Sequence, residues 1–295
     1  MSRRHRAETH DRPHAPTPSH TSADTAVPPA IVSTVERNNV SVRGGDAARP
    51  MIFAHGFGCS HEAWRDVAPR FINSHRVITF DQVGAGGSDL AAYDRGKYDS
   101  LHGYADDLIE IIDELDLTDV VYVGHSVSCM IGVLASIRRP ELFGALILVG
   151  SSPRHVAAEG YTGGFSEADI EALLDSLDAN YLGWSAEMAP AIAGNADRPE
   201  VGERLVESFC SIEPEIAGQF ARVTFLSDTR DELPRVTTPT LVLQSSDDIL
   251  APLSVGDYVH EHIRGSKLVV MTSRGHMPNL SNPDQLVKEI RTFLS

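Results

Sequence analysis

Long hydrophobic runs and paired cysteines are both missing from this sequence of 295 residues. No stretch approaches the roughly 18 consecutive apolar residues of a transmembrane helix, which excludes a membrane-spanning segment. Cys59, Cys129 and Cys210 lie far apart, and the sequence contains no CxxC pair. A disulfide framework and a metal site are therefore not expected, and the cytoplasm is the expected location.

Basic residues are also few. Lys and Arg number 25 against 41 Asp and Glu, which gives a net charge of −16. A surface this acidic repels the phosphates of nucleic acids and of anionic lipids, so neither nucleic acid nor a membrane is an expected partner. Hydrophobic residues make up 42% of the chain, which is enough for a folded core.

Residues 1–30 differ in composition from the rest of the chain, with four histidines and five prolines among them. The pair Arg3-Arg4 resembles the start of a twin-arginine export signal, but no apolar segment follows it, so export is not expected. The irregular spacing of the histidines favours a solvated tail over a metal site. We predict a disordered tail over residues 1–30.

From residue 31 onward the pattern is typical of an α/β domain. Segments 31–35 and 40–43 alternate and are rich in β-forming residues, so both are expected to be extended. Short apolar strands then alternate with helical periodicity, which predicts a mostly parallel sheet with helices on both faces. The predicted core comprises residues 31–151 and 234–295. Its apolar strands are expected at 51–54, 77–80, 120–123, 145–149, 240–243 and 267–271.

Residues 152–233 interrupt this alternation and contain no strand pattern. Ser166-Glu167-Ala168-Asp169 is a capping box, and an apolar stripe at helical spacing follows it. Three further short helices are expected, two of them beginning near Pro199 and Pro214. We interpret the segment as a four-helix cap inserted into the sheet domain.

The strongest chemical signal is Gly124-His125-Ser126-Val127-Ser128, which directly follows the predicted strand 120–123. A nucleophile on a tight turn between a strand and a helix adopts a strained backbone that lifts its Oγ clear of the sheet. The residues two before and two after it crowd each other and must be small, as Gly124 and Ser128 are. An ordinary strand–turn–helix is the alternative, but the position favours a nucleophile elbow at Ser126.

A serine hydroxyl is a weak nucleophile at neutral pH and needs a base, together with an acid that orients the base. His276 is the candidate base because it follows the last predicted strand, in a loop over the carboxyl edge of the sheet. The chain has 13 histidines, so a surface-loop histidine is the alternative. His55 and His125 flank the site and are interpreted as structural.

The acid is expected between the serine and the histidine, after the strand 240–243. This chain order is typical of a nucleophile elbow on a parallel sheet. Asp247 and Asp248 are the two candidates. We choose Asp248, which stands four residues before Pro252, and interpret Asp247 as a turn residue.

Acyl transfer also needs N–H donors for the developing oxyanion. The N–H of Val127, at the helix start, is one candidate. Phe57, in His55-Gly56-Phe57-Gly58 after the first buried strand, is the other, with a glycine turn around a core phenylalanine as the alternative. The glycine-rich segment 81–89 lacks the spacing of a phosphate loop, so we interpret it as a structural turn and expect no cofactor.

Together these motifs resemble the α/β-hydrolase fold from residue 31 to the end of the chain. Within that fold the sequence resembles most the RsbQ-like stress-signalling hydrolases of bacteria, and it is similar also to the plant strigolactone and karrikin receptors. The similarity rests on eight segments: Gly56–Cys59, Gly124–Ser128, Ser136–Leu142, Tyr161–Phe165, Asp197–Glu200, Phe209–Ser211, Ser246–Pro252 and Arg274–His276.

The resemblance implies a catalytic triad and an oxyanion hole made of residues already singled out: Ser126, His276 and Asp248, with Phe57 and Val127. It also implies a V-shaped lid of four helices over an apolar pocket. Three cap aromatics are candidates for substrate contacts, with plain core packing as the alternative: Phe165, Trp184 and Phe225.

These residues predict a serine hydrolase that acts on a small apolar ester or lactone. A lid over the pocket predicts slow turnover, limited by opening or product release. The resemblance implies a role in stress signalling, in which the protein activates a PAS-domain, PP2C-type serine phosphatase that controls a general-stress sigma factor. A purely metabolic carboxylesterase or lactonase without a signalling partner is the alternative.

Overall fold

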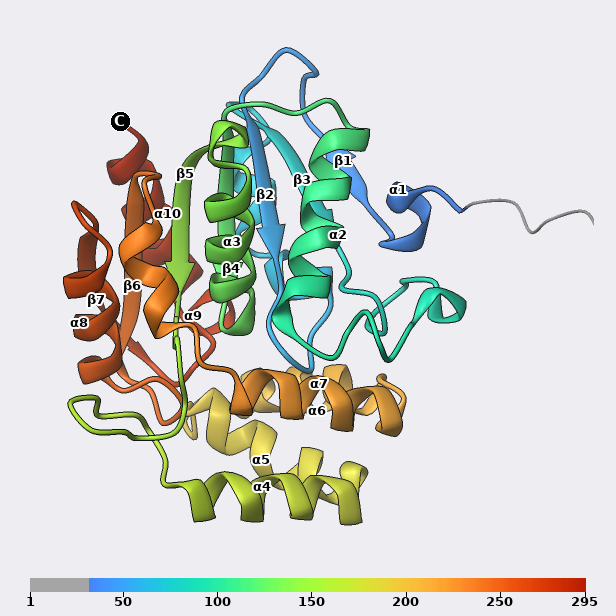
Figure 1. Ribbon diagram of the computed structural model, residues 1–295, viewed down its shortest axis with the longest axis vertical. Helices are drawn as coiled ribbons and strands as arrows, with labels where there is room; N and C mark the ends of the chain where they lie inside the picture. The colour runs from blue at the N-terminus through green and yellow to red at the C-terminus, as the bar shows by residue number, and fades with distance from the viewer. Residues whose placement is uncertain (1–31) are drawn as a thin grey trace, which may run out of the picture. The chain divides into compact units, whose positions relative to one another are not determined.

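A computed structural model describes residues 32–295, and the tail predicted over residues 1–30 lies outside the described residues. A seven-stranded sheet, in the order β1-β3-β2-β4-β5-β6-β7, runs through this part of the chain (Figure 1). β1 is antiparallel to β3, and all other neighbours are parallel. The mostly parallel sheet is therefore confirmed. Its strands are β1 (Ser41–Arg43), β2 (Pro50–Ala54), β3 (Arg76–Phe80), β4 (Val120–His125), β5 (Phe143–Val149), β6 (Thr240–Asp247) and β7 (Lys267–Arg274).

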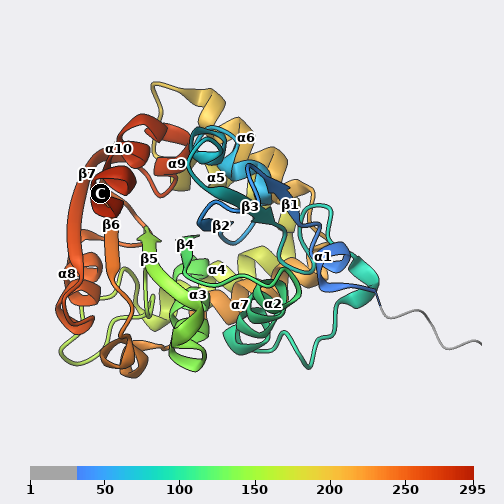
Figure 2. The same ribbon diagram turned by 90° about the horizontal axis from the view of Figure 1, so that it is seen from above.

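Helices cover both faces of the sheet (Figure 2), as expected. On one face lie α2 (Leu101–Glu114), α3 (Val127–Arg138) and α8 (Leu253–His262); on the other lie α10 (Pro283–Leu294) and two short 3₁₀ helices within residues 61–71. Successive strand residues point to opposite faces. Ile52 and Tyr122 therefore lie in one hydrophobic core, and Phe53 and Val121 in the other.

The carboxyl ends of the parallel strands share one edge of the sheet. β2 pairs with β3 on one side and with β4 on the other, so the direction in which the chain adds strands reverses at β2. Loops that leave neighbouring strands in opposite directions open a crevice at such a point, and ligands of open α/β sheets bind there. The segments after β2 and β4 are the loop of Phe57 and the turn of Ser126.

Four helices lie across this carboxyl edge (Figure 1): α4 (Glu167–Ala179), α5 (Tyr181–Ala193), α6 (Pro199–Cys210) and α7 (Pro214–Leu226). We call them the cap helices. α5 packs on α6 and α4 on α7. The expected capping box starts α4, since Ser166 Oγ accepts from Asp169 N at 3.2 Å and Asp169 Oδ2 accepts from Ser166 N at 2.9 Å.

One local prediction is wrong. Alternation predicts an extended chain over residues 31–35, yet Thr34–Arg37 forms the short helix α1. Ser33 Oγ caps the helix by accepting from Glu36 N at 3.1 Å, and Thr34 N donates to Glu114 Oε2 at 2.7 Å. These hydrogen bonds outweigh the weak β propensity of a short segment. The neighbouring prediction for 40–43 is confirmed by β1.

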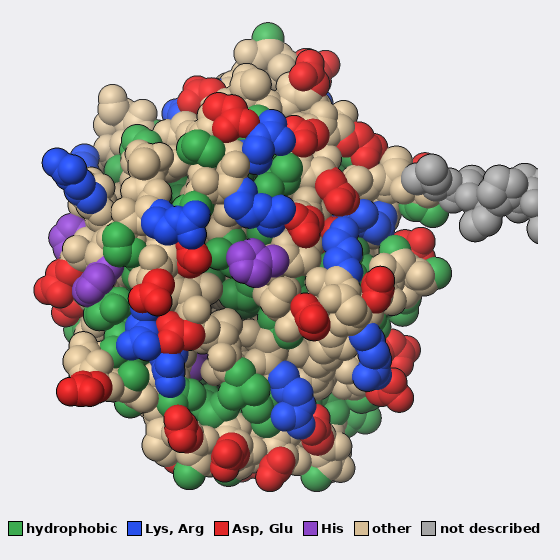
Figure 3. Space-filling model, viewed as in Figure 1, with side chains coloured by type: hydrophobic (Ala, Val, Ile, Leu, Met, Phe, Trp, Pro, Cys, Tyr) green, Lys and Arg blue, Asp and Glu red, His purple; other side chains and the backbone are tan. Residues whose placement is uncertain are grey.

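The surface of residues 32–295 carries many paired charges. Acidic and basic side chains are interspersed over the face seen in Figure 3. Arg154 pairs with Asp228 at 2.7 Å, and Lys97 reaches the buried carboxylate of Asp107. Within this range no helix combines the length and the apolar character that crossing a bilayer would require.

Candidate active site

Ser126 occupies the tight turn between β4 and α3. Its backbone has φ +57° and ψ −125°, a conformation that costs strain for a residue with a side chain. A β-carbon at position 124 would lie 2.6 Å from the Ser128 carbonyl oxygen, so only glycine fits there. The turn thus has the crowding and the strain of a nucleophile elbow, and it directs Ser126 Oγ away from the sheet.

The structure brings Ser126, His276 and Asp248 into one hydrogen-bonded row. His276 Nε2 lies 2.8 Å from Ser126 Oγ, and His276 Nδ1 lies 2.7 Å from Asp248 Oδ2. Asp248 follows β6 and His276 follows β7, so parallel strands deliver all three side chains to the same edge. The three are buried, which shields their hydrogen bonds from water. Such a row can move a proton from the hydroxyl to the imidazole as the oxygen attacks.

The carboxylate of Asp248 is held in its ionised form. Burial alone would raise its pKa, but the neighbouring His276 and the N–H groups of Leu250 and Ala251 outweigh burial and lower it. Those two N–H groups donate to Asp248 Oδ1 at 2.9 and 3.0 Å. Asp247 is exposed, but it is the last residue of β6 and pairs with Arg274 of β7, so its interpretation as a turn residue is wrong. Its backbone carbonyl accepts from Gly275 N at 2.6 Å.

Phe57 and Val127, the two residues expected to supply oxyanion donors, both belong to segments next to Ser126. Val127 is the first residue of α3, and N–H groups in a first helical turn have no partner within the helix and carry partial positive charge. A β-carbon at position 56 would lie 3.0 Å from Ser126 Cβ, so the Phe57 loop runs very close to the nucleophile. Ser128 Oγ donates to the His55 carbonyl, which ties the elbow to that loop.

The two flanking histidines both have structural contacts. His55 Nε2 accepts from Gln82 N at 3.0 Å, so its Nδ1 carries the proton and donates to the Gly56 carbonyl at 2.9 Å. His125 Nε2 donates to the His276 backbone carbonyl at 2.7 Å. Burial lowers the pKa of both rings, that of His125 to about 3, so both are neutral at pH 7.

A small cavity of about 20 Å³ lies above Ser126, between the sheet edge and the cap helices. Of the three aromatic candidates, Phe225 lines it. Trp184 lies behind the lining, with its ring 5.6 Å from that of Phe209, and Phe165 pairs with Val156 in a β-bridge. The full lining is Phe57, His125, Ser126, His155, Ile192, Leu205, Phe209, Thr224, Phe225, Leu250, His276 and Met277.

Comparison with known proteins identifies the family. The sequence model that describes the alpha/beta hydrolase family matches residues 51–289 of this chain. The chain belongs to the α/β-hydrolase family. Relatives of 38% and 41% identity are named esterases, and the chain is a hydrolase of the carboxylesterase type.

Three relatives show how far the similarity extends. The strigolactone esterase D14 of Arabidopsis thaliana is 41% identical over 262 residues, covering 88% of this chain and 97% of that protein. The Karrikin insensitive 2 receptor CA of Petunia hybrida is 36% identical over 253 residues, covering 85% and 93%. A hydrolase from Oleispira antarctica superposes with a TM-score of 0.86 at 37% identity, covering 88% and 96%. The expected relation to the plant receptors is confirmed.

Several lining residues of this hydrolase were not singled out from the sequence. His155 and Thr224 are the most informative, because they are polar and buried in a mostly apolar wall. His155 lies shortly after β5, and a polar residue after the carboxyl end of a parallel strand is a detectable signal. Thr224 gave no comparable signal, because its place in the lining depends on how α7 crosses the sheet edge.

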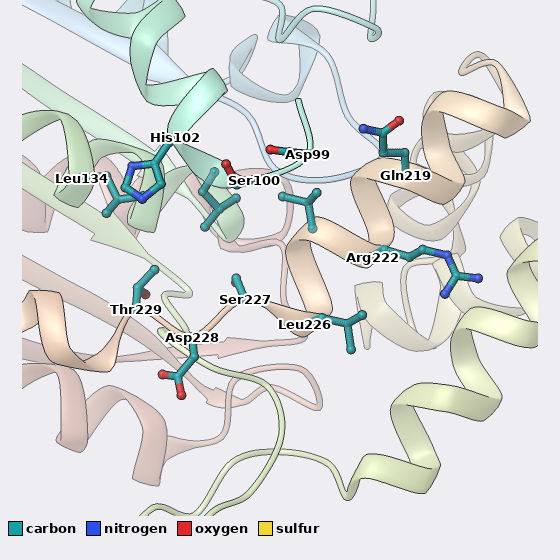
Figure 4. A pocket seen from close by; sticks show the side chains of 12 residues that line it. Asp99, Ser100, His102, Leu134, Gln219, Arg222, Leu226, Ser227, Asp228 and Thr229 are labelled. Carbon is teal, nitrogen blue, oxygen red and sulfur yellow. The ribbon is translucent and has the colours of Figure 1, made fainter. Parts of the chain in front are cut away.

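A wider groove, of about 500 Å³, lies elsewhere on the surface (Figure 4). It runs between the start of α2 and the end of α7, and no triad residue lines it. Its labelled side chains are Asp99, Ser100, His102, Leu134, Gln219, Arg222, Leu226, Ser227, Asp228 and Thr229. Size alone does not make an active site, and the hydrogen-bonded row of Ser126, His276 and Asp248 lies at the smaller cavity instead. In residues 32–295 no three His, Cys, Asp or Glu side chains gather as metal ligands would.

Proposed function

We propose that Ser126, His276 and Asp248 form the catalytic triad of an esterase that acts on a small apolar ester or lactone. The observation that carries the proposal is the position of His276, whose two ring nitrogens contact Ser126 Oγ and Asp248 Oδ2 at once. The ionised Asp248 keeps the proton on Nδ1. The lone pair of Nε2 therefore faces the serine hydroxyl, as a general base requires.

The reaction proceeds in two halves. Ser126 Oγ attacks the carbonyl carbon, His276 takes the hydroxyl proton, and the same proton goes to the departing alkoxide. The N–H groups of Phe57 and Val127 hold the negative oxygen of each tetrahedral intermediate. Water then attacks the acyl-enzyme, His276 takes its proton and returns it to Ser126, and the acid leaves. No step uses a cofactor.

The cavity supports the proposal of a small and apolar substrate. Its volume of about 20 Å³ is far below the ~300–1,000 Å³ of pockets that hold larger ligands. Apolar side chains such as Ile192 and Phe209 dominate its wall. Side chains or cap helices must therefore move to admit even a short ester. That movement, rather than bond making, limits turnover in this proposal.

Labelling with a fluorophosphonate tests the nucleophile directly. The reagent phosphonylates an activated serine, so intact-mass measurement and peptide mapping are expected to place one label on Ser126. Ser126→Ala is expected to remain unlabelled. Ser128→Ala, which removes the neighbouring hydroxyl and keeps Ser126, is the matched control and is expected to take the label. A label on another residue in the native protein contradicts the proposal.

We also propose a cytoplasmic, RsbQ-like signalling role, in which a bound or hydrolysed small molecule lets the protein activate a PAS-domain serine phosphatase. Support comes from relatives named as receptors that are 36% identical to this chain. The cap also exposes apolar side chains, Leu182 at 57% and Leu226 at 56%, that a partner protein could cover.

Paired assays distinguish signalling from metabolism. Glu203→Lys changes an exposed cap position and is expected to impair phosphatase activation while ester hydrolysis stays intact. Ser126→Ala is expected to impair both activities if hydrolysis drives the switch. The readout is the activity of a PAS-domain phosphatase from the same genome. If the native protein stimulates no such phosphatase, the metabolic carboxylesterase is the better account.

A further inference from the structure

Three residues in the wall of the Ser126 cavity each have a buried polar atom without a hydrogen-bond partner within residues 32–295. One is His125 Nδ1, which lies against Gly56, where a β-carbon would come within 2.8 Å of it. The other two are His155 Nδ1 and Thr224 Oγ1, and both are shielded from solvent. They come from different parts of the fold, since His155 lies in the loop after β5 and Thr224 in the cap helix α7. Both line the same cavity as Ser126 and His276.

Unpaired polar atoms are uncommon in protein interiors, because burial removes their hydrogen bonds to water. The side chains around these two offer no replacement. The ring of Phe225 lies 5.0 Å from that of His155, and Phe57, Ile192 and Leu250 line the rest of the wall. Apolar side chains at both positions would avoid this cost, so the unpaired atoms are explained best by a ligand that satisfies them.

The loop that carries His155 is anchored by backbone hydrogen bonds, and the imidazole of His155 is uncharged. Its backbone carbonyl accepts from Phe165 N at 3.1 Å, and Ala157 N donates to the Phe165 carbonyl at 2.8 Å, which anchors the loop on both sides. Burial and the nearby His276 together lower the pKa of His155 to about 4, and Asp248 and the Thr224 backbone offset this only in part. A neutral imidazole offers one N–H and one lone pair, and the Thr224 hydroxyl offers both as well. These groups suit a neutral oxygen rather than an anion.

We propose that His155 and Thr224 form a polar subsite that binds a second acceptor oxygen of the substrate, away from the reacting carbonyl. The preferred substrate is then an ester or lactone that carries an ether, carbonyl or hydroxyl oxygen on an otherwise apolar frame. This inference rests on the proposed esterase function and makes it more specific. His155 and Thr224 are specificity-determining residues and take no part in bond making.

Two pairs of esters of equal size test the subsite. p-Nitrophenyl methoxyacetate against p-nitrophenyl butanoate adds an oxygen on the acyl side, and 2-methoxyethyl acetate against butyl acetate adds one on the alcohol side. The measured quantity is the ratio of kcat/KM within each pair. Comparing this ratio between variants cancels the intrinsic reactivity of the esters.

Thr224→Val and His155→Phe keep the size of each side chain and remove the hydrogen-bonding atoms. Each is expected to lower the ratio in at least one pair by about threefold to tenfold, the effect of one neutral hydrogen bond. Ile192→Val is the matched control, because it alters the wall without a polar atom, and it is expected to change both members of a pair alike. If His155→Phe fails to fold, Thr224→Val carries the test alone.

An unchanged ratio in both pairs for Thr224→Val and for a folded His155→Phe overturns the subsite. That outcome differs from failure of the proposed function. If hydrolysis depends on Ser126 while the ratios stay constant, the esterase stands and the subsite is wrong. If hydrolysis does not depend on Ser126, the esterase proposal itself fails.

Discussion

His125 Nε2 donates a hydrogen bond to the backbone carbonyl of His276 across 2.7 Å. The residue that precedes the nucleophile in the chain therefore holds the loop that carries the base. The two rings lie 5.0 Å apart, and His125 is neutral because burial lowers its pKa to about 3. The contact joins β4 to the loop after β7, which fixes the spacing between Ser126 and His276.

Replacing His125 tests this positioning role. His125→Phe keeps a ring in the core and loses the hydrogen bond, so we expect kcat to fall by about tenfold with KM little changed, as a mispositioned base predicts. His125→Gln retains an amide donor and is expected to recover part of kcat. Steady-state kinetics with p-nitrophenyl acetate provide the measurement. Unchanged kcat in a folded His125→Phe would show that the contact is dispensable.

The two neighbouring aspartates separate the proposed orienting acid, Asp248, from the residue at the end of β6, Asp247. Asp248→Asn removes the charge that sets the His276 tautomer, so kcat is expected to fall by about 10³ to 10⁴. Asp247→Asn keeps its backbone contact to Gly275 and is expected to stay within about threefold of the native rate. The reverse ranking in kcat would show that the assignment of the acid is wrong.

The sequence contains enough local information to predict the parallel sheet, the four cap helices and the candidate triad. Buried strands appear as short apolar runs, and the elbow at Ser126 needs small neighbours that can be read directly. Asp248 and His276 each follow a strand, so sheet geometry alone brings them to one edge. The helix at Thr34–Arg37 was not predicted, because one of the contacts that stabilise it is with Glu114, which lies far along the chain.

The cavity wall was harder to predict, because it depends on how the cap helices cross the sheet. Trp184 and Phe225 both belong to cap helices and are both buried, yet only Phe225 lines the cavity. Residue type gives no means of choosing between them. The contact of His125 with the His276 loop spans 151 positions of sequence and leaves no local pattern.

Removing a ring from the cavity wall is expected to broaden chain-length selectivity. Phe225→Ala enlarges the small space above Ser126, so the rate with p-nitrophenyl hexanoate relative to the acetate is expected to rise by about fivefold or more. Trp184→Phe, behind the lining, is the comparison and is expected to leave that ratio nearly constant. An unchanged ratio in Phe225→Ala would mean that Phe225 does not limit substrate size.

Stability is expected to fall as the pH drops below about 6.5. Burial lowers the pKa of His125 to about 3 and that of His155 to about 4 in the folded protein, from an ordinary 6.5. At pH values between the folded-state pKa and 6.5, the unfolded chain therefore binds more protons than the folded protein. Unfolding is favoured as the pH falls through this range. One such histidine contributes at most ~1.4 kcal/mol per pH unit. Asp81 raises the pKa of His61 in the folded protein. Protonated His61 therefore stabilises the fold, and this stabilisation is lost only as the pH rises above 6.5.

Denaturant titrations between pH 7 and pH 4.5 measure this dependence. The free energy of unfolding is expected to fall across the range, and less steeply in His155→Phe, which lacks one of the titrating groups. Carboxylates whose pKa is lowered in the folded protein, such as Asp81 with a pKa of about 2, reduce the free energy of unfolding further only below about pH 3.8. A slope that is identical in the native protein and in His155→Phe would contradict the buried neutral state of His155.

The rate of Ser126→Ala tests the central claim most directly. Hydrolysis of p-nitrophenyl acetate is measured in the native protein and in the variant, with circular dichroism and thermal unfolding to show that both are folded. The account predicts a loss of about 10⁴ to 10⁶ in kcat, and no greater loss when His276→Ala is added. Near-native turnover by folded Ser126→Ala would contradict it.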